Sequence, residues 1–178
     1  MDLLEFARGP ALQVASIIFI AGLIWRLIHL LLIPKKIDMS EARASGERVG
    51  GVRAIFSRFL HHGEFRVLTA NGSALAYTIH LGLAVVIFGS APHIFFIESF
   101  TGLSWPALPN VAIHLAAALT LAALIGSLVR RRTHPVLRML SNFDDYFTWL
   151  VTAAPVLTGL LTVAHLGGRY DTLIAIHI

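Results

Sequence analysis

Histidine is the residue type of this chain that could do chemistry. His80 and His93 interrupt an otherwise apolar run from Tyr77 to Phe96. An imidazole at membrane depth is costly, and residues of this kind are usually functional. The two histidines are 13 residues apart, which is about 20 Å on a helix that rises ~1.5 Å per residue. On one helix they would lie near opposite faces of the ~30 Å hydrocarbon layer. We therefore expect two metal-ligand levels, as a transmembrane di-haem electron path requires.

The composition restricts the class of protein and the ligands it can offer. Of the 178 residues, 56% are hydrophobic and 13% are charged, against roughly 25% charged in a soluble domain. The chain contains nine histidines and no cysteine. This excludes disulfides, thiolate-bound iron–sulfur clusters and c-type haem attachment, and leaves imidazole as the available metal ligand.

The apolar runs predict an all-α integral membrane helix bundle, folded as one domain over residues 1–178. Four runs are long enough to cross a bilayer, and a fifth begins before the sequence stops. Their expected bounds are 12–33, 73–97, 110–129, 146–165 and 172–178. The last run gives only about 10 Å of helix, a third of a crossing. We therefore expect that the working protein is longer, or that another subunit completes this helix.

The basic residues predict the orientation in the membrane. Seven Lys and Arg residues lie between the first and second spans, and four lie between the third and fourth, out of 14 in all. By the positive-inside rule these two loops are cytoplasmic and the N-terminus is outside. Because the net charge of +4 comes from these loops, it does not indicate binding to nucleic acid.

This topology sorts the histidines by depth. His80 falls near the cytoplasmic face, whereas His93 and His177 both fall near the outer face. His93 and His177 could therefore ligate one haem iron from opposite sides. Small residues on the second span would let a flat macrocycle approach, although such residues are common at any membrane helix interface. They are Gly82, Ala84, Gly89, Ser90 and Ala91.

Three further histidines are secondary candidates. His29 is at a depth that could match His80. His114 and His165 lie near the outer ends of their spans, where each could be a haem ligand, a quinone contact or an interfacial residue. Any single intramembrane histidine could instead hydrogen-bond a neighbouring helix or face a hydrated cavity.

The order of several short motifs resembles the membrane cytochrome b family of the respiratory nitrate reductase gamma subunit. The resemblance is greatest to relatives that serve iron–sulfur or heterodisulfide-reductase-like partners. It covers about 100 residues, from His80 to His177. The motifs are His80-Leu-Gly, Ala91-Pro-His93, Gly102-Leu-Ser-Trp-Pro-Ala-Leu-Pro109, Arg131-Arg132 with Pro135-Val-Leu-Arg138, Asp144-Asp145-Tyr146, Pro155-Val-Leu-Thr-Gly159 and Leu173-Ile-Ala-Ile-His177-Ile.

The resemblance implies a five-helix protein with two bis-histidine haems b. His93 and His177 match the ligands of the outer haem, and His80 matches one ligand of the inner haem. Two departures stand out. In the nitrate reductase subunits the two histidines of the second helix are ten residues apart, and here Ser90 occupies that position. The family's last helix also continues to a further histidine, the partner of the His80 position, whereas this sequence stops at Ile178.

We expect an electron-transfer subunit of a quinol-linked respiratory oxidoreductase complex in a bacterial or archaeal cytoplasmic membrane. One or two haems b would pass electrons between quinone and a cytoplasmic iron–sulfur or flavin subunit docked on the basic loops. No acid–base pair or nucleophile appears in the spans, so no catalytic residue is assigned. Two alternatives are a proton- or ion-translocating transporter subunit that uses the histidines, and a cofactor-free membrane anchor.

Overall fold

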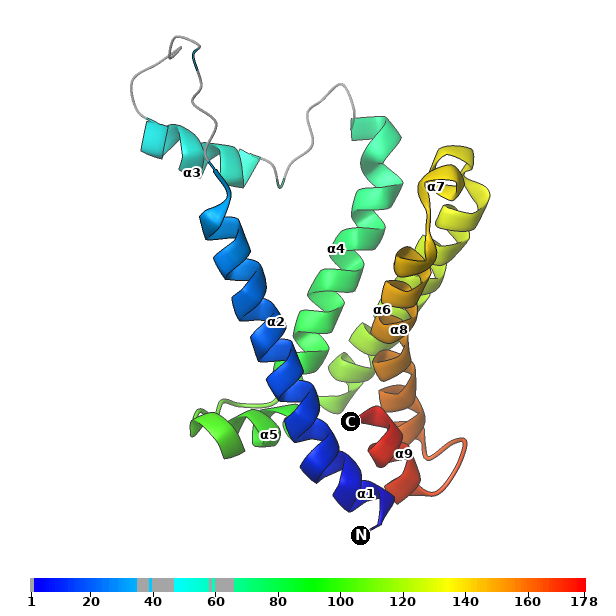
Figure 1. Cartoon of the computed structure of the whole chain (residues 1–178). Helices are drawn as coiled ribbons and strands as arrows, with labels where there is room; N and C mark the ends of the chain where they lie inside the picture. The colour runs from blue at the N-terminus through cyan, green and yellow to red at the C-terminus, as the bar shows by residue number, and fades with distance from the viewer. Residues whose placement is uncertain (1, 35–38, 40–46, 58, 60–65) are drawn as a thin grey trace. The chain divides into compact units, whose positions relative to one another are not determined.

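The computed structural model describes residues 2–34, 39, 47–57, 59 and 66–178. These residues are predominantly helical, and no strand occurs among them. The helices are α1 (Leu3–Phe6), η1 (Ala7–Ala11), α2 (Leu12–Leu32), α3 (Glu47–Ser57), α4 (Arg66–Gly89), α5 (Ala91–Thr101), α6 (Asn110–Thr133), α7 (Pro135–Leu140), α8 (Phe143–Ala164) and α9 (Tyr170–His177). Figure 1 shows their order along the chain.

Four described helices are long and apolar enough to cross a membrane: Leu3–Leu32, Thr69–Gly89, Asn110–Thr133 and Phe143–Ala164. The prediction of an all-α membrane bundle is therefore confirmed. The first helical stretch begins earlier than expected, at Leu3, and the third and fourth extend by a few residues. Four residues of the first basic loop lie outside the described residues: Lys35, Lys36, Arg43 and Arg58.

The chain divides into two compact units. The first unit comprises Met1–Arg8 and Asn71–Ile178, and the second comprises Gly9–Ala70. One boundary falls at a break in the helical backbone, where Gly9 has non-helical dihedral angles next to Pro10, and the other falls within α4, between Ala70 and Asn71. The second unit carries α2 and α3. The first unit carries every candidate ligand except His29.

The core of the first unit forms where α4, α6 and α8 meet. Ala117 and Leu124 of α6 and Ala153 and Val156 of α8 are buried, and side chains of α4 pack against them. The Trp149 indole N–H donates to the Leu124 carbonyl oxygen at 2.7 Å, which ties α8 to α6. Most large apolar side chains outside this core are exposed, as expected for helices whose outer faces contact lipid.

At two glycines of α4, protein neighbours occupy the space where a side chain would lie. A methyl group at Gly82 would overlap the hydroxyl of Thr120, a fully buried residue of α6. A methyl group at Gly89 would come within 2.7 Å of Leu108. The expectation that these small residues leave room for a macrocycle is therefore wrong at Gly82 and Gly89. They allow close packing of protein segments, the alternative reason for small residues in membrane helices.

The second span is interrupted, contrary to the expectation of one helix over 73–97. Ser90 is extended (φ −78°, ψ 129°), and a separate helix, α5, begins at Ala91. Pro92 accounts for the break, because it has no N–H to donate to the Phe88 carbonyl and it is well tolerated in the first turn of the new helix. His80 and His93 therefore belong to different helices. The distance of about 20 Å along one helix does not apply to them.

α9 is held at one end of the first unit. It packs against α8 and α1, and Leu173 is its buried residue. In Figure 1, α5 and α9 lie at one end of α6 and α8, and α7 lies at the other end. The chain reaches α9 through a turn in which His165 and Gly167 have positive φ values of 53° and 95°.

Candidate functional site

His93 and His177 come together in the first unit, although they are far apart in the sequence. Their ring centroids are 6.0 Å apart and their planes differ by 13°. Both side chains are partly buried. Imidazole nitrogens bind first-row metals at about 2.0–2.1 Å, so two imidazoles on opposite sides of one ion have centroids about 6 Å apart. Ordinary offset ring pairs span about 4.5–7 Å, so the hydrogen bonds of each ring are also needed to interpret the pair.

The hydrogen bond of His93 fixes its tautomer. Its Nδ1 lies 3.0 Å from the Val86 carbonyl oxygen. A carbonyl oxygen only accepts, so Nδ1 carries the proton and Nε2 keeps the lone pair. A metal-ligating histidine commonly donates its second ring N–H to a backbone carbonyl in this way. The break after α4 brings His93 back toward this carbonyl.

His177 is oriented by Thr158 of α8. The Thr158 hydroxyl lies 3.1 Å from His177 Nδ1, and it donates to the carbonyl oxygens of Ala154 and Pro155 at 2.9 and 3.2 Å. A hydroxyl has a single proton. When that proton is directed to the backbone, the hydroxyl oxygen is free to accept from His177 Nδ1–H. The lone pair of His177 is therefore also on Nε2.

Gly159 makes room for the His177 ring. A Cβ at this position would lie 3.0 Å from His177 Cε1, which is too close for an ordinary contact. Thr158 and Gly159 both belong to the Pro155–Gly159 motif of the sequence, but sequence reasoning assigned them no role. The sequence feature that could have identified them is a Thr-Gly pair within a membrane helix. Only the position of α9 against α8 shows which ring they serve.

The loop between α5 and α6 caps the broken end of α4. The Trp105 indole N–H donates to the Phe88 carbonyl oxygen at 2.6 Å, which is the group that Pro92 leaves without its helical partner. The Leu108 N–H donates to the Gly89 carbonyl oxygen at 2.9 Å. Satisfying these carbonyls matters because unpaired backbone groups are expensive in an apolar environment. The capping therefore supports the position of His93.

His80 lies on α4, apart from this pair. Its Nδ1 is 2.7 Å from the Ala76 carbonyl oxygen, so its lone pair is on Nε2 as well. The side chain is exposed. Among the described residues, no histidine ring lies in contact with the ring of His80. A second ligand for it is therefore not identified in the described part of the chain.

The secondary candidates lie elsewhere. His114 is exposed on α6 and His29 is exposed on α2. His165 ends α8 in the left-handed conformation, and its ring lies 5.4 Å from that of Tyr170. The described residues contain no group of three or more His, Cys, Asp or Glu side chains that could hold a metal ion. Within that part of the chain, the His93–His177 pair thus offers two imidazoles and no third side chain of these types.

An exposed ion pair lies at the start of α9. The Arg169 guanidinium donates to Asp171 at 3.0 and 3.2 Å. This side-chain hydrogen bond holds the pKa of Asp171 below its usual range and raises the pKa of Arg169. Asp171 also accepts from the Thr172 N–H at 2.9 Å. The negative charge at the start of α9 suits the helix dipole.

Comparison with known proteins gives one relative. The chain is 30% identical to a protein of Nitratidesulfovibrio vulgaris over 181 aligned positions, which span 97% of this chain and 78% of that protein. The chain belongs to that protein's family. The relative is described only as "Protein", which names no activity. No family model matches the chain, and no solved structure matches it significantly.

Proposed function

We propose that the chain is a haem b membrane subunit that passes electrons between the quinone pool and a peripheral iron–sulfur or flavin subunit. The observation that carries this proposal is the His93–His177 pair, with both Nδ1 atoms hydrogen-bonded and both Nε2 atoms left with lone pairs. The resemblance to the nitrate reductase gamma-subunit family agrees with this function.

The donor set suits haem better than a bare ion. Zinc sites use three or four protein ligands, whereas a porphyrin supplies four nitrogens and needs only two axial ligands. His93 and His177 provide two imidazoles on different helices, α5 and α9. Imidazole is a common axial ligand of iron in haem proteins.

When bound, the haem supplies reversible one-electron chemistry. The chain holds the two imidazoles in place. The Val86 carbonyl and the Thr158 hydroxyl fix the ring orientations, and such second partners also raise the basicity of a ligand. Gly159 allows the His177 ring to lie against α8. The largely apolar residues of α4, α5 and α8 limit access of water, which is one determinant of a haem potential.

His80 is the candidate ligand of a second haem. Its Nε2 is the nitrogen with the lone pair, as in the outer pair. Two haems at different depths would each cover part of the membrane thickness, so the distance of each electron transfer would be shorter. The partner subunit would dock at the end of α6 that carries Arg130, Arg131 and Arg132, which the positive-inside rule predicts to be cytoplasmic.

The first test is the visible spectrum of the full chain purified from membranes. We expect a Soret band, reduced absorption bands typical of b haems, and one or two haems per chain. A preparation without a Soret band, after expression with ample haem supply, would refute the proposal. It would leave the transporter subunit and the cofactor-free anchor as the remaining functions.

The second test removes one ligand. His93→Ala should lower the haem content by one equivalent per chain, because an axial ligand of the outer site is lost. His134→Ala is the matched control, since His134 is an exposed histidine at the start of α7, at the end of α6 opposite to α5 and α9. An unchanged spectrum and haem content in the His93 variant would contradict the assignment.

A further inference from the structure

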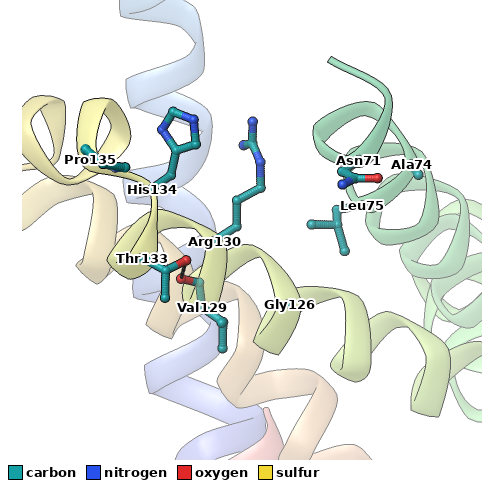
Figure 2. Close-up of a pocket in the computed structure, with 9 residues that line it drawn as sticks. All are labelled: Asn71, Ala74, Leu75, Gly126, Val129, Arg130, Thr133, His134 and Pro135. Carbon is teal, nitrogen blue, oxygen red and sulfur yellow. Dashed lines mark hydrogen bonds between the residues drawn. The ribbon is translucent and has the colours of Figure 1, made fainter. Parts of the chain in front are cut away.

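A hollow of about 710 Å³ lies between the beginning of α4 and the end of α6. Figure 2 shows its lining residues. One part of the lining is apolar and the other is polar. The apolar residues are Ala74, Leu75, Gly126, Val129 and Pro135, and the polar residues are Asn71, Arg130, Thr133 and His134. A ligand that fills both parts must itself be amphiphilic.

Arg130 differs from the two arginines that follow it. Arg131 pairs with Asp145 at 2.9 Å and donates to the Ser141 hydroxyl at 3.0 Å. Arg132 lies over the Tyr146 ring, 5.7 Å from its centroid. The Arg130 side chain makes no hydrogen bond or ion pair within the described part of the chain. It extends into the hollow instead (Figure 2).

The Arg130 guanidinium lies against Gly72 of α4, where the absence of a side chain leaves room for it. A Cβ on Gly72 would lie 3.2 Å from the central carbon of the Arg130 guanidinium, so the cation rests directly against the backbone of α4. The Arg130 side chain is partly buried. No described residue supplies a counter-charge to it, and a guanidinium taken partly out of water without one is unfavourable. The hollow is therefore a place where an anion would stabilise the protein.

The depth of the hollow fits the headgroup region. α6 has 24 residues, about 36 Å at ~1.5 Å per residue, which exceeds the ~30 Å hydrocarbon layer. The last turn of α6, with Arg130, thus reaches the interface. Basic pockets between membrane helices on the cytoplasmic side commonly bind anionic lipid headgroups.

We infer that this hollow binds the headgroup of an anionic phospholipid. The phosphodiester accepts from the Arg130 guanidinium, beside the polar groups of Asn71 and Thr133. The first carbons of an acyl chain lie along Ala74, Leu75 and Val129. A neutral quinone would fill the apolar part but would not neutralise the cation. This inference does not depend on the haem proposal.

The test measures binding of soluble short-chain lipids to the full, delipidated protein in a non-ionic detergent. Dihexanoyl phosphatidylglycerol is the anionic probe, and dihexanoyl phosphatidylcholine and inorganic phosphate are the comparisons. We expect phosphatidylglycerol to bind at least tenfold more tightly than either. Arg130→Gln should weaken its binding about tenfold, as expected for loss of a charge-assisted hydrogen bond. Arg132→Gln should leave it unchanged, because Arg132 lies over Tyr146.

A second variant distinguishes binding of the acyl chain from binding of the headgroup. Ala74→Trp fills the apolar part and keeps Arg130, so phosphatidylglycerol affinity should fall while phosphate affinity does not. This variant also carries the test if Arg130→Gln fails to fold. Equal affinity for phosphatidylcholine, equal affinity for phosphate, or an equal effect of Arg132→Gln would overturn the inference. A quinone analogue that displaces phosphatidylglycerol equally well from the wild-type protein and from Arg130→Gln would also overturn the inference. That result would point to a quinone site.

Discussion

At the scale of single residues, the candidate site depends on where two protons lie. His93 and His177 each use Nδ1–H for a hydrogen bond, to the Val86 carbonyl and the Thr158 hydroxyl respectively. The nitrogens that remain are those a metal would need. Neither acceptor could be identified from the sequence. The Val86 carbonyl is a backbone group, and Thr158 is one of many membrane threonines.

Thr158 gives a test of this hydrogen bonding that rests on the proposed function. Thr158→Val keeps the side-chain volume but removes the acceptor for His177 Nδ1, so outer haem affinity should fall about 10- to 100-fold and the midpoint potential of that haem should shift. Thr158→Ser keeps the hydroxyl and should behave as wild type. Haem content and redox titration measure both. An identical potential in the valine and serine variants would show that Thr158 does not position His177.

At the scale of elements, a broken helix and a short helix build the site. Pro92 ends α4 at Gly89 and lets α5 begin, and Trp105 and Leu108 then satisfy the freed carbonyls. α9 brings His177 to the same end of the first unit through its contacts with α8 and α1. Pro92 was visible in the sequence, but its effect was underestimated because a proline in a membrane helix need not end the helix.

The close packing of α4 on α6 gives a second prediction. Gly82→Ala should lower the free energy of unfolding by about 1–3 kcal/mol, because its methyl group would overlap the Thr120 hydroxyl. Thr120→Ala in the same chain should recover part of this loss. Gly22→Ala is the control, since nothing lies within 4 Å of a Cβ at Gly22. Unfolding in detergent measures all four proteins, and equal stability of the Gly82 and Gly22 variants would contradict the packing.

At the scale of the whole molecule, the basic loops decide orientation. Arg130, Arg131, Arg132 and Arg138 gather around α7, at the end of α6 opposite to α5 and α9. From the positive-inside rule we predict that α7 faces the cytoplasm and that the His93–His177 pair lies near the outer face. The proposed depth of the haem, the proposed docking side of the partner subunit and the proposed lipid leaflet all depend on this predicted orientation.

The absence of native cysteine makes the orientation directly testable. Met139→Cys on α7 and Leu103→Cys in the loop after α5 introduce thiols at sites that are 85% and 66% exposed. A membrane-impermeant maleimide added to intact spheroplasts should label position 103 and should label position 139 only after permeabilisation. The reverse pattern would invert the topology and move the partner subunit to the other side.

The sequence alone determined the helical class, the number of apolar spans and imidazole as the available ligand. These properties depend on local composition, because lipid selects apolar segments of sufficient length whatever their neighbours are. The tertiary structure alone decided that Trp105 and Leu108 cap the broken end of α4, that Gly82 meets Thr120, and that Thr158 and Gly159 face His177. Each of these depends on contacts between segments distant in the chain, and such contacts leave no periodic signal in the sequence.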